Sequence, residues 1–314
     1  MSPRLPATTD SNRIRVGVCG SFQSGKSLLI NCLLGREVAL SGEGMATTRW
    51  TTVHQYAAKE EVVFRDGAGK HVETHSLEGY LALLRKLAAP SESKGLNQVC
   101  RVEVSLNLHE LDRVVLVDTP GFGHDDLDDA MAAAAVRDLD LVLLVQPGEA
   151  FGEQEIEFLK VIQGLNKPCV IVQNCRELRQ WCPELDRNRR IHAGLLDEAN
   201  ASDVTHYVIG GSGTFNFLWH WFGAFPDRRH APETIAAATA LSRHFPDWQL
   251  TPAAAAEEMI RRSRVPVLRS FVFPEPEHSV GVNAYCLGRL HRAVAAWSQK
   301  AQEQIQQIKE TIKT

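Results

Sequence analysis

Short apolar runs alternate with segments of helical spacing along the first two-thirds of the chain. The runs are rich in Val, Ile and Leu and end at Gly, Asp or Asn, which is typical of strands buried in a parallel sheet. They predict strands over residues 14–19, 51–58, 61–64, 99–108, 112–118, 140–145, 168–174 and 205–210. Between them, the spacing predicts helices over residues 26–34, 76–88, 128–139, 153–165 and 184–199. The alternation indicates an α/β fold, a mostly parallel sheet with helices on both faces that binds ligands at the carboxyl ends of its strands.

A tight turn is expected at the edge of this sheet. The stretch RDGAGK at residues 65–70 follows a short strand and predicts a hairpin. We expect Asp66-Gly67 to supply the positive-φ position that such turns need.

Residues 215–314 have a different pattern and predict a C-terminal helical appendage. The aromatic run FNFLWHWFGAF at 215–225 is either core beneath helices or an exposed partner or membrane patch. Helical spacing follows over 232–245, over 251–264 and from 283 to the end. The last segment has one apolar stripe, which packs either on the rest of the chain or on a partner helix: Leu287, Leu290, Val294, Trp297, Ala301, Ile305, Ile308 and Ile312. The expected regions are a flexible N-terminal arm (1–13), an α/β domain (14–214) and the helical C-terminal region (215–314).

Composition narrows the classes of function. A net charge of −4 gives no general attraction to nucleic acid, so we expect no nucleic-acid partner. Seven scattered cysteines, an odd number with no C-x-x-C pair, favour reduced thiols and a cytoplasmic setting. The N-terminus lacks the apolar core of a secretory leader, and no apolar run approaches the roughly 20 residues of a membrane helix. Any membrane contact is therefore expected to be peripheral.

The strongest chemical motif is GSFQSGKS at residues 20–27, which matches G-x-x-x-x-G-K-S between a predicted strand and a predicted helix. Two glycines let the backbone wrap closely, so that its N–H groups and the helix N-terminus can face phosphate oxygens. Lys26 would contact the β- and γ-phosphates, and Ser27 would bind Mg²⁺. The alternative is a chance glycine turn. The loop residues expected to bind nucleotide are Gly20, Ser21, Phe22, Ser24, Gly25, Ser27 and Leu28.

Two further loops carry residues that suit a magnesium–phosphate site. VVLVDTPG (114–121) ends a strand at Asp118, which would hold Mg²⁺ through water, while the N–H of Gly121 would sense a γ-phosphate. The polar loop GEGMATTRW (42–50) offers Thr47 or Thr48 as a further magnesium ligand. The alternatives are an ordinary Asp-Thr-Pro-Gly turn and a threonine that caps the start of a strand.

Read together, these segments resemble the dynamin-like branch of the large GTPases. The resemblance is carried by GSFQSGKSLLINCLLGREVALSGEGMATTRW, LVDTPGFG and LVLLVQPGEAFGEQE, and it spans about residues 14–214. In that family the switch I threonine lies 21 residues after the P-loop lysine, which selects Thr47 here (47 − 26 = 21). The resemblance implies a GTP-binding G domain, GTP hydrolysis with Mg²⁺, homodimerisation through the G domain, and C-terminal helices that pack with or beside it. These helices could also bring a protein or membrane partner.

The chain departs from the family pattern at the third P-loop position. Dynamins have a catalytic Gln there, followed by Ser, whereas this chain has Phe22 and then Gln23. Gln23 could take over the positioning of water or of a monovalent cation. Phe122 follows Gly121, and His124 with the acidic run 125–129 forms a switch II of unassigned role. We also expect residues 215–314 to form a small bundle and not a dynamin stalk with a separate membrane domain.

The turn NCRE, after the strand 168–174, stands where guanine-nucleotide switches carry Asn-Lys-x-Asp. Glu177 offers a carboxylate that can accept from guanine N1–H and the N2 amino group, and Arg176 can lie along the base. Guanylate-binding proteins read guanine with an Arg-Asp pair, which makes Arg176-Glu177 an analogue. Asn174 would brace the P-loop, and GGSGT at 210–214 could add N–H groups. The alternative is a surface turn with an ordinary Arg–Glu pair.

The sequence thus predicts a Mg²⁺-dependent GTPase, stimulated by dimerisation or a partner. The alternatives are a nucleotide switch with negligible hydrolysis and a P-loop ATPase with relaxed base specificity. The expected catalytic residues are Lys26, Gln23 and Thr47, and the expected magnesium ligands are Ser27, Thr47 and Asp118.

Overall fold

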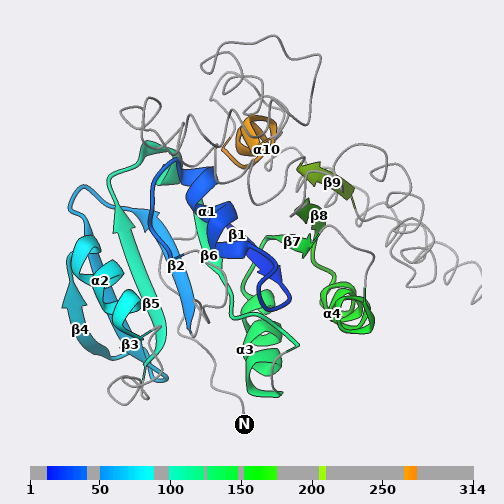
Figure 1. Ribbon diagram of the computed structural model, residues 1–314, viewed down its shortest axis with the longest axis horizontal. Coiled ribbons are helices and arrows are strands. Elements are labelled where there is room, and N and C mark those ends of the chain that lie inside the picture. Colours follow the sequence, from blue (N-terminus) through cyan, green and yellow to red (C-terminus); the bar gives the residue numbers. More distant parts are fainter. Residues whose placement is uncertain are drawn as a thin grey trace, which may run out of the picture.

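A single mixed sheet of nine strands organises the part of the chain that the structure describes (Figure 1). The structure, a computed structural model, describes residues 13–40, 50–87, 99–123, 126–147, 152–174, 205–209 and 265–273. The strand order is β4-β3-β5-β2-β6-β1-β7-β8-β9. The strands are β1 (Ile14–Gly20), β2 (Thr51–Tyr56), β3 (Glu61–Asp66), β4 (His71–His75), β5 (Val99–Leu106), β6 (Val114–Asp118), β7 (Leu141–Pro147), β8 (Cys169–Asn174) and β9 (Thr205–Ile209).

Strand direction divides the sheet into two parts. From β6 through β1, β7 and β8 to β9, every pairing is parallel. On the other side, β2 runs antiparallel to β6, parallel to β5, and β3 is antiparallel to both β5 and β4. The parallel part brings the carboxyl ends of β1, β6 and β8 to one edge, where the sequence places its phosphate motifs.

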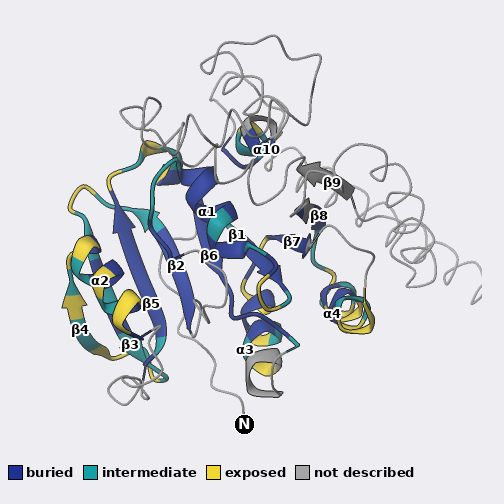
Figure 2. Ribbon diagram, viewed as in Figure 1, coloured by how far each residue is buried: buried dark blue, intermediate teal, exposed yellow. Residues whose placement is uncertain are grey.

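Helices cover both faces of the sheet, as the sequence predicted. On one face α1 (Lys26–Leu34) and α2 (Leu77–Leu87) bury their apolar sides in a single core with β1, β5 and β6. On the other face α3 (Asp126–Arg137) and α4 (Glu153–Gly164) pack on β7 and the central strands. Most residues of the central strands are accordingly buried, whereas β4 at the edge is partly exposed (Figure 2). The α/β fold class is therefore confirmed.

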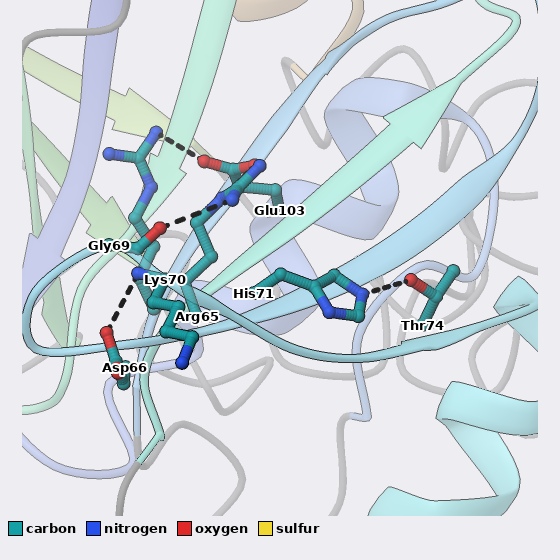
Figure 3. Close-up of polar contacts among 8 residues, drawn as sticks. Arg65, Asp66, Gly69, Lys70, His71, Thr74 and Glu103 are labelled. Carbon is teal, nitrogen blue, oxygen red and sulfur yellow. Dashed lines mark hydrogen bonds and ion pairs between the residues drawn. The ribbon is translucent and has the colours of Figure 1, made fainter.

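The β3–β4 hairpin turns later than the sequence analysis expected. The positive φ falls on Gly69 (79°) and not on Gly67, so the assignment to Asp66-Gly67 is wrong. The reason is that the Asp66 carboxylate accepts the N–H groups of Ala68 (2.9 Å) and Lys70 (2.8 Å) and extends the turn. Arg65 next to this turn donates to the carbonyl of Gly69 at 3.3 Å (Figure 3).

A short helix in the C-terminal region, α10 (Val265–Val272), was not predicted and packs on α1. Its buried side chains repeat at helical spacing, and its proline lies in the first turn, where the missing N–H costs nothing. Arg269 joins it to the domain by donating from Nε to the carbonyl of Leu33 (2.9 Å) and by pairing with Glu110. The expected helices over 184–199, 232–245, 251–264 and 283–314 lie outside the described residues.

A buried histidine on β2 makes the stability of this fold sensitive to acid. His54 is fully buried in register with Leu116, and burial lowers the pKa of its imidazole from 6.5 to about 4. Between these two values the unfolded chain binds the proton more tightly than the folded one. The contribution of neutral His54 to the free energy of unfolding is therefore fully present above about pH 6.5 and is lost as the pH drops towards 4.

We expect His54 to contribute a loss in free energy of unfolding on the order of 1.4 kcal/mol per pH unit within this window. Urea unfolding at pH 7 and at pH 5 measures it, because His54→Leu should flatten the slope that the wild type shows. His109→Gln is the matched control, since the His109 side chain is 83% exposed. Equal slopes in wild type and His54→Leu would show that other groups set the acid sensitivity.

Candidate functional site

The loop after β1 has the tight wrap that its two glycines predict. Gly25 has a left-handed backbone (φ 93°) directly before α1, and a Cβ there would lie 2.2 Å from Asn174 Nδ2. A Cβ on Gly20 would lie 2.4 Å from the carbonyl oxygen of Val145. Only glycine fits at these two places, so the backbone comes as close to its neighbours as a phosphate cradle requires.

Lys26, the first residue of α1, is held over this loop. Its Nζ donates to the carbonyls of Gly20 (3.1 Å) and Ser21 (2.9 Å), and the side chain is only 6% exposed. The two carbonyls fix the ammonium at the helix N-terminus, where its charge adds to the partial positive charge of the helix. An anion at this position would meet both.

Ser27 and Asp118 come together from α1 and β6 and form a site that fits magnesium. Ser27 Oγ donates to Asp118 Oδ2 at 3.2 Å, and both residues are buried. A hydroxyl and a carboxylate are hard oxygen ligands, and Mg²⁺ characteristically uses one or two such protein ligands together with phosphate oxygens. In the described part of the chain no group of three His, Cys, Asp or Glu side chains forms a denser metal site. The residues therefore fit a metal held jointly with phosphate.

Neighbouring contacts fix both strand ends. Thr119, after Asp118, donates from Oγ1 to the carbonyl of Val18 on β1 at 3.2 Å. Cys19 lies beside it, and burial raises the pKa of this thiol to about 12, which keeps it neutral at physiological pH. Cys19 is thus a packing residue at this site and not a thiolate ligand.

Asn174 at the end of β8 reaches the P-loop, as the sequence analysis expected. Its Nδ2 donates to the carbonyl of Ser24 at 2.9 Å across 150 positions of sequence, and the residue is 2% exposed. The β8–β7 and β7–β1 pairings bring these two segments to the same edge. The P-loop is therefore supported from the strand that leads to NCRE.

The other predicted loop residues differ in exposure. Phe22 is 36% exposed, and Gln23 is exposed with a left-handed backbone (φ 59°) that is uncommon for a residue with a side chain. Ser24 is fully buried, and Leu28 is partly buried. Gln23 is thus an exposed residue at a strained turn of the loop.

The segment after Asp118 lies against the P-loop. Phe22 N–H donates to the carbonyl of Phe122 (3.1 Å), and Phe122 N–H donates to the carbonyl of Gly20 (3.4 Å). A Cβ on Gly121 would lie 2.8 Å from Phe22 Cα and 3.1 Å from Lys26 Nζ. Gly121 is therefore close to the lysine with which it was predicted to share a γ-phosphate.

The described residues bring together Gly20, Ser21, Phe22, Gln23, Ser24, Gly25, Lys26, Ser27, Gly121, Asp118 and Asn174 from the predicted set. Thr47, Thr48, Arg176, Glu177 and His124 lie outside the described residues, as do 125, 210–214 and 215–225. Sequence reasoning missed Thr119 and two residues of α4 that contact the Gly121 segment, Gln154 and Phe158. The only signal in the sequence was that Thr119 lies within the Asp-Thr-Pro-Gly motif and that Phe158 lies on the apolar face of a predicted helix.

The parallel part of the sheet brings a glycine loop after β1 and an aspartate at the end of β6 to one edge, which defines a P-loop G domain. The chain belongs to the Dynamin family, whose family model matches residues 16–174. The resemblance seen in the sequence is thereby confirmed.

Individual relatives match more partially. Dynamin-like protein 2 of Campylobacter jejuni is 26% identical over 177 residues, which cover 54% of this chain and 27% of the relative. A solved bacterial dynamin pair, described as sensing and tethering membranes over a long range, is 15% identical over 83% of this chain and 38% of that one, with a TM-score of 0.46. Era of Aquifex aeolicus bound to GDP·AlF4⁻ is 15% identical over 72% of this chain and 66% of that one, with a TM-score of 0.36. The chain thus spans about a quarter of the curated relative's length.

Proposed function

We propose that this protein binds GTP together with Mg²⁺ and hydrolyses it to GDP. The observation that carries the proposal is the contact of Ser27 with Asp118, 3.2 Å, directly beside the lysine of a glycine-lined loop. A loop of this shape suits a di- or triphosphate, and the oxygen pair suits its metal. Membership of the Dynamin family supports guanine as the base.

Three residues are proposed to hold the metal: Ser27, Asp118 through water, and Thr47 from the switch I loop. When bound, Mg²⁺ would neutralise charge on the β- and γ-phosphate oxygens. The protein's own part is to hold Ser27 Oγ and Asp118 Oδ2 in contact in a buried setting. Such a setting strengthens the electrostatic interactions inside it.

Catalysis is proposed to be positional and electrostatic. Lys26 and the loop N–H groups stabilise the charge on the transferred phosphoryl group, and Gly121 N–H contacts the γ-phosphate. The exposed amide of Gln23 orients the attacking water or a monovalent cation, and Thr47 orders the same region. Arg176 and Glu177 read the base. Asn174 supports the loop through its hydrogen bond to the Ser24 carbonyl.

One observation favours a second candidate, a nucleotide switch with negligible hydrolysis. The third loop position, from which dynamins direct a catalytic amide, holds the apolar and exposed Phe22. If Gln23 does not replace that amide, the protein binds nucleotide without turning it over.

The arrangement of the whole chain is also a proposal. We infer a flexible arm over 1–13, a G domain over 14–214 and a helical region over 215–314. The packing of α10 on α1 supports an association of the helical region with the G domain. From the family we also infer that the protein forms a homodimer through its G domain. The C-terminal helices would bind a protein partner or the surface of a membrane. We propose that the protein acts in the cytoplasm. In the described ranges, no helix has the length and apolar character needed to cross a membrane.

Competition for a fluorescent GTP analogue tests the base that the site selects. With Mg²⁺ present, we expect unlabelled GTP to compete at least about a hundredfold better than ATP, a preference of roughly 2.7 kcal/mol. Glu177→Ala should lose that preference because it removes the carboxylate acceptor, whereas Glu78→Ala, an exposed glutamate on α2, should keep it. Equal competition by ATP would identify a P-loop protein that does not read guanine.

Multiple-turnover phosphate release distinguishes the two candidates. A GTPase releases many phosphates for each protein molecule, while the switch releases fewer than one. Gln23→Ala should abolish turnover and leave nucleotide affinity intact if Gln23 orients the water.

A further inference from the structure

The segment Gly121–Gly123 is held between the P-loop and α4. On one side its backbone pairs with the P-loop through Phe122, as a short parallel extension of the β1–β6 pairing between Ser21 and Phe122. On the other side it meets the first two turns of α4. The position of the Gly121 N–H therefore depends on both neighbours.

The contact with α4 is an aromatic stack and a close fit at glycine. The rings of Phe122 and Phe158 lie 4.2 Å apart at an interplanar angle of 17°, and both side chains are buried. One turn earlier on the same helix, Gln154 Oε1 lies 2.3 Å from where a Cβ of Gly123 would be. Gly123 has a left-handed backbone (φ 82°), so only glycine combines this turn with this contact.

The helix itself is firmly based. Ile162, one turn beyond Phe158, is fully buried in the same core, and the N–H of Gly152 before the helix donates to Glu155 Oε2 at 3.0 Å. Because α4 is held by the core, the stack on Phe158 restrains the ring of Phe122. The two hydrogen bonds between Phe122 and the P-loop are of ordinary or long length, 3.1 and 3.4 Å. We therefore expect the stack on Phe158, more than the hydrogen bonds to the P-loop, to determine the position of Gly121–Gly123.

We propose that Phe158, together with the contact of Gln154 at Gly123, is a positioning residue that holds Gly121 at the distance from Lys26 at which its N–H reaches a γ-phosphate. The inference rests on the proposed nucleotide binding and adds a residue that sets the preference for triphosphate over diphosphate. Only a triphosphate uses the Gly121 contact. Displacing the segment therefore weakens triphosphate binding and leaves diphosphate binding, which depends on the P-loop, unchanged.

The test compares dissociation constants for GDP and for a non-hydrolysable GTP analogue, both with Mg²⁺. We expect Phe158→Ala to weaken binding of the analogue about tenfold with GDP affinity unchanged. Phe158→Leu, which keeps an apolar side chain but no ring, should lie between Phe158→Ala and wild type. Ile162→Ala is the matched control: it also removes a buried side chain from α4, and it should leave the ratio of the two constants at the wild-type value.

Amide hydrogen exchange of residues 114–123 gives a readout independent of affinity. Exchange at Gly121–Gly123 should rise in Phe158→Ala and Gln154→Ala but not in Ile162→Ala. If Phe158→Ala does not fold, the dissociation constants and the hydrogen exchange are measured on Phe158→Leu and Gln154→Ala instead. A ratio that stays at the wild-type value, or a gain in triphosphate affinity, in the folded variants would overturn the inference.

The failure of this inference can be told apart from failure of the proposed function. If the wild type binds neither nucleotide, both fail. If the wild type binds both, Lys26→Ala abolishes binding of both, and Phe158→Ala behaves like Ile162→Ala, the proposed function stands and the positioning role alone is excluded.

Discussion

Lys26→Ala is expected to bind GTP and GDP at least about a hundredfold more weakly than wild type, a loss of roughly 2.7 kcal/mol or more. The ammonium lies at the N-terminus of α1, held by the carbonyls of Gly20 and Ser21, so it meets a phosphate with little reorganisation. Titration with a fluorescent guanine nucleotide measures the loss directly. Lys59→Ala is the control, because the Lys59 side chain is 87% exposed.

The same substitution also removes two internal hydrogen bonds from the loop. We therefore expect some loss of stability, of about 1–2 kcal/mol, which thermal unfolding without nucleotide would record separately. A folded Lys26→Ala protein with wild-type affinity would exclude the P-loop as the phosphate site.

Asn174→Ala is expected to have the second-largest effect. It removes the donor to the Ser24 carbonyl and leaves that carbonyl buried beside the space of the lost side chain. We expect a loss of about 1–3 kcal/mol in the free energy of unfolding. Because Gly25 packs directly on Asn174 Nδ2, the loop should also lose its shape, and nucleotide affinity should fall by on the order of tenfold.

Urea unfolding and nucleotide titration on one preparation measure both effects. Asn107→Ala is the matched control, since Asn107 is exposed and donates to Glu60 from its backbone N–H, which the substitution keeps. The role would be refuted by a destabilised variant with unchanged affinity, since Asn174 would then support the fold without shaping the phosphate loop.

Local patterns predicted those parts of the site that depend on neighbouring residues in the chain. A buried strand, a glycine loop and a helix that starts at Lys26 follow one another directly, so spacing was enough to find them. Asp118 was predicted for the same reason, because its strand ends in Asp-Thr-Pro-Gly. The approach of Ser27 to Asp118 then follows from the parallel pairing of β1 with β6.

Contacts set by tertiary packing were not predicted. Phe158 is one of several apolar positions on α4, and nothing local indicates that its ring faces Phe122. The insertion of β5 between β3 and β2 likewise depends on pairings between segments far apart in the chain. In the hairpin, a hydrogen-bonding side chain, Asp66, moved the positive φ to Gly69 against the usual dipeptide rule.

The bond between Arg269 and the carbonyl of Leu33 joins residues 236 positions apart. A ribosome builds the chain from the N-terminus, and Asn174, which supports the P-loop, is made 95 residues before Arg269 (269 − 174). At about 5–20 residues per second, that interval lasts roughly 5–20 s. β9, the last described strand, also precedes α10 in the chain. During synthesis, the phosphate loop and its support therefore exist for several seconds before the contact that joins α10 to the end of α1 can form.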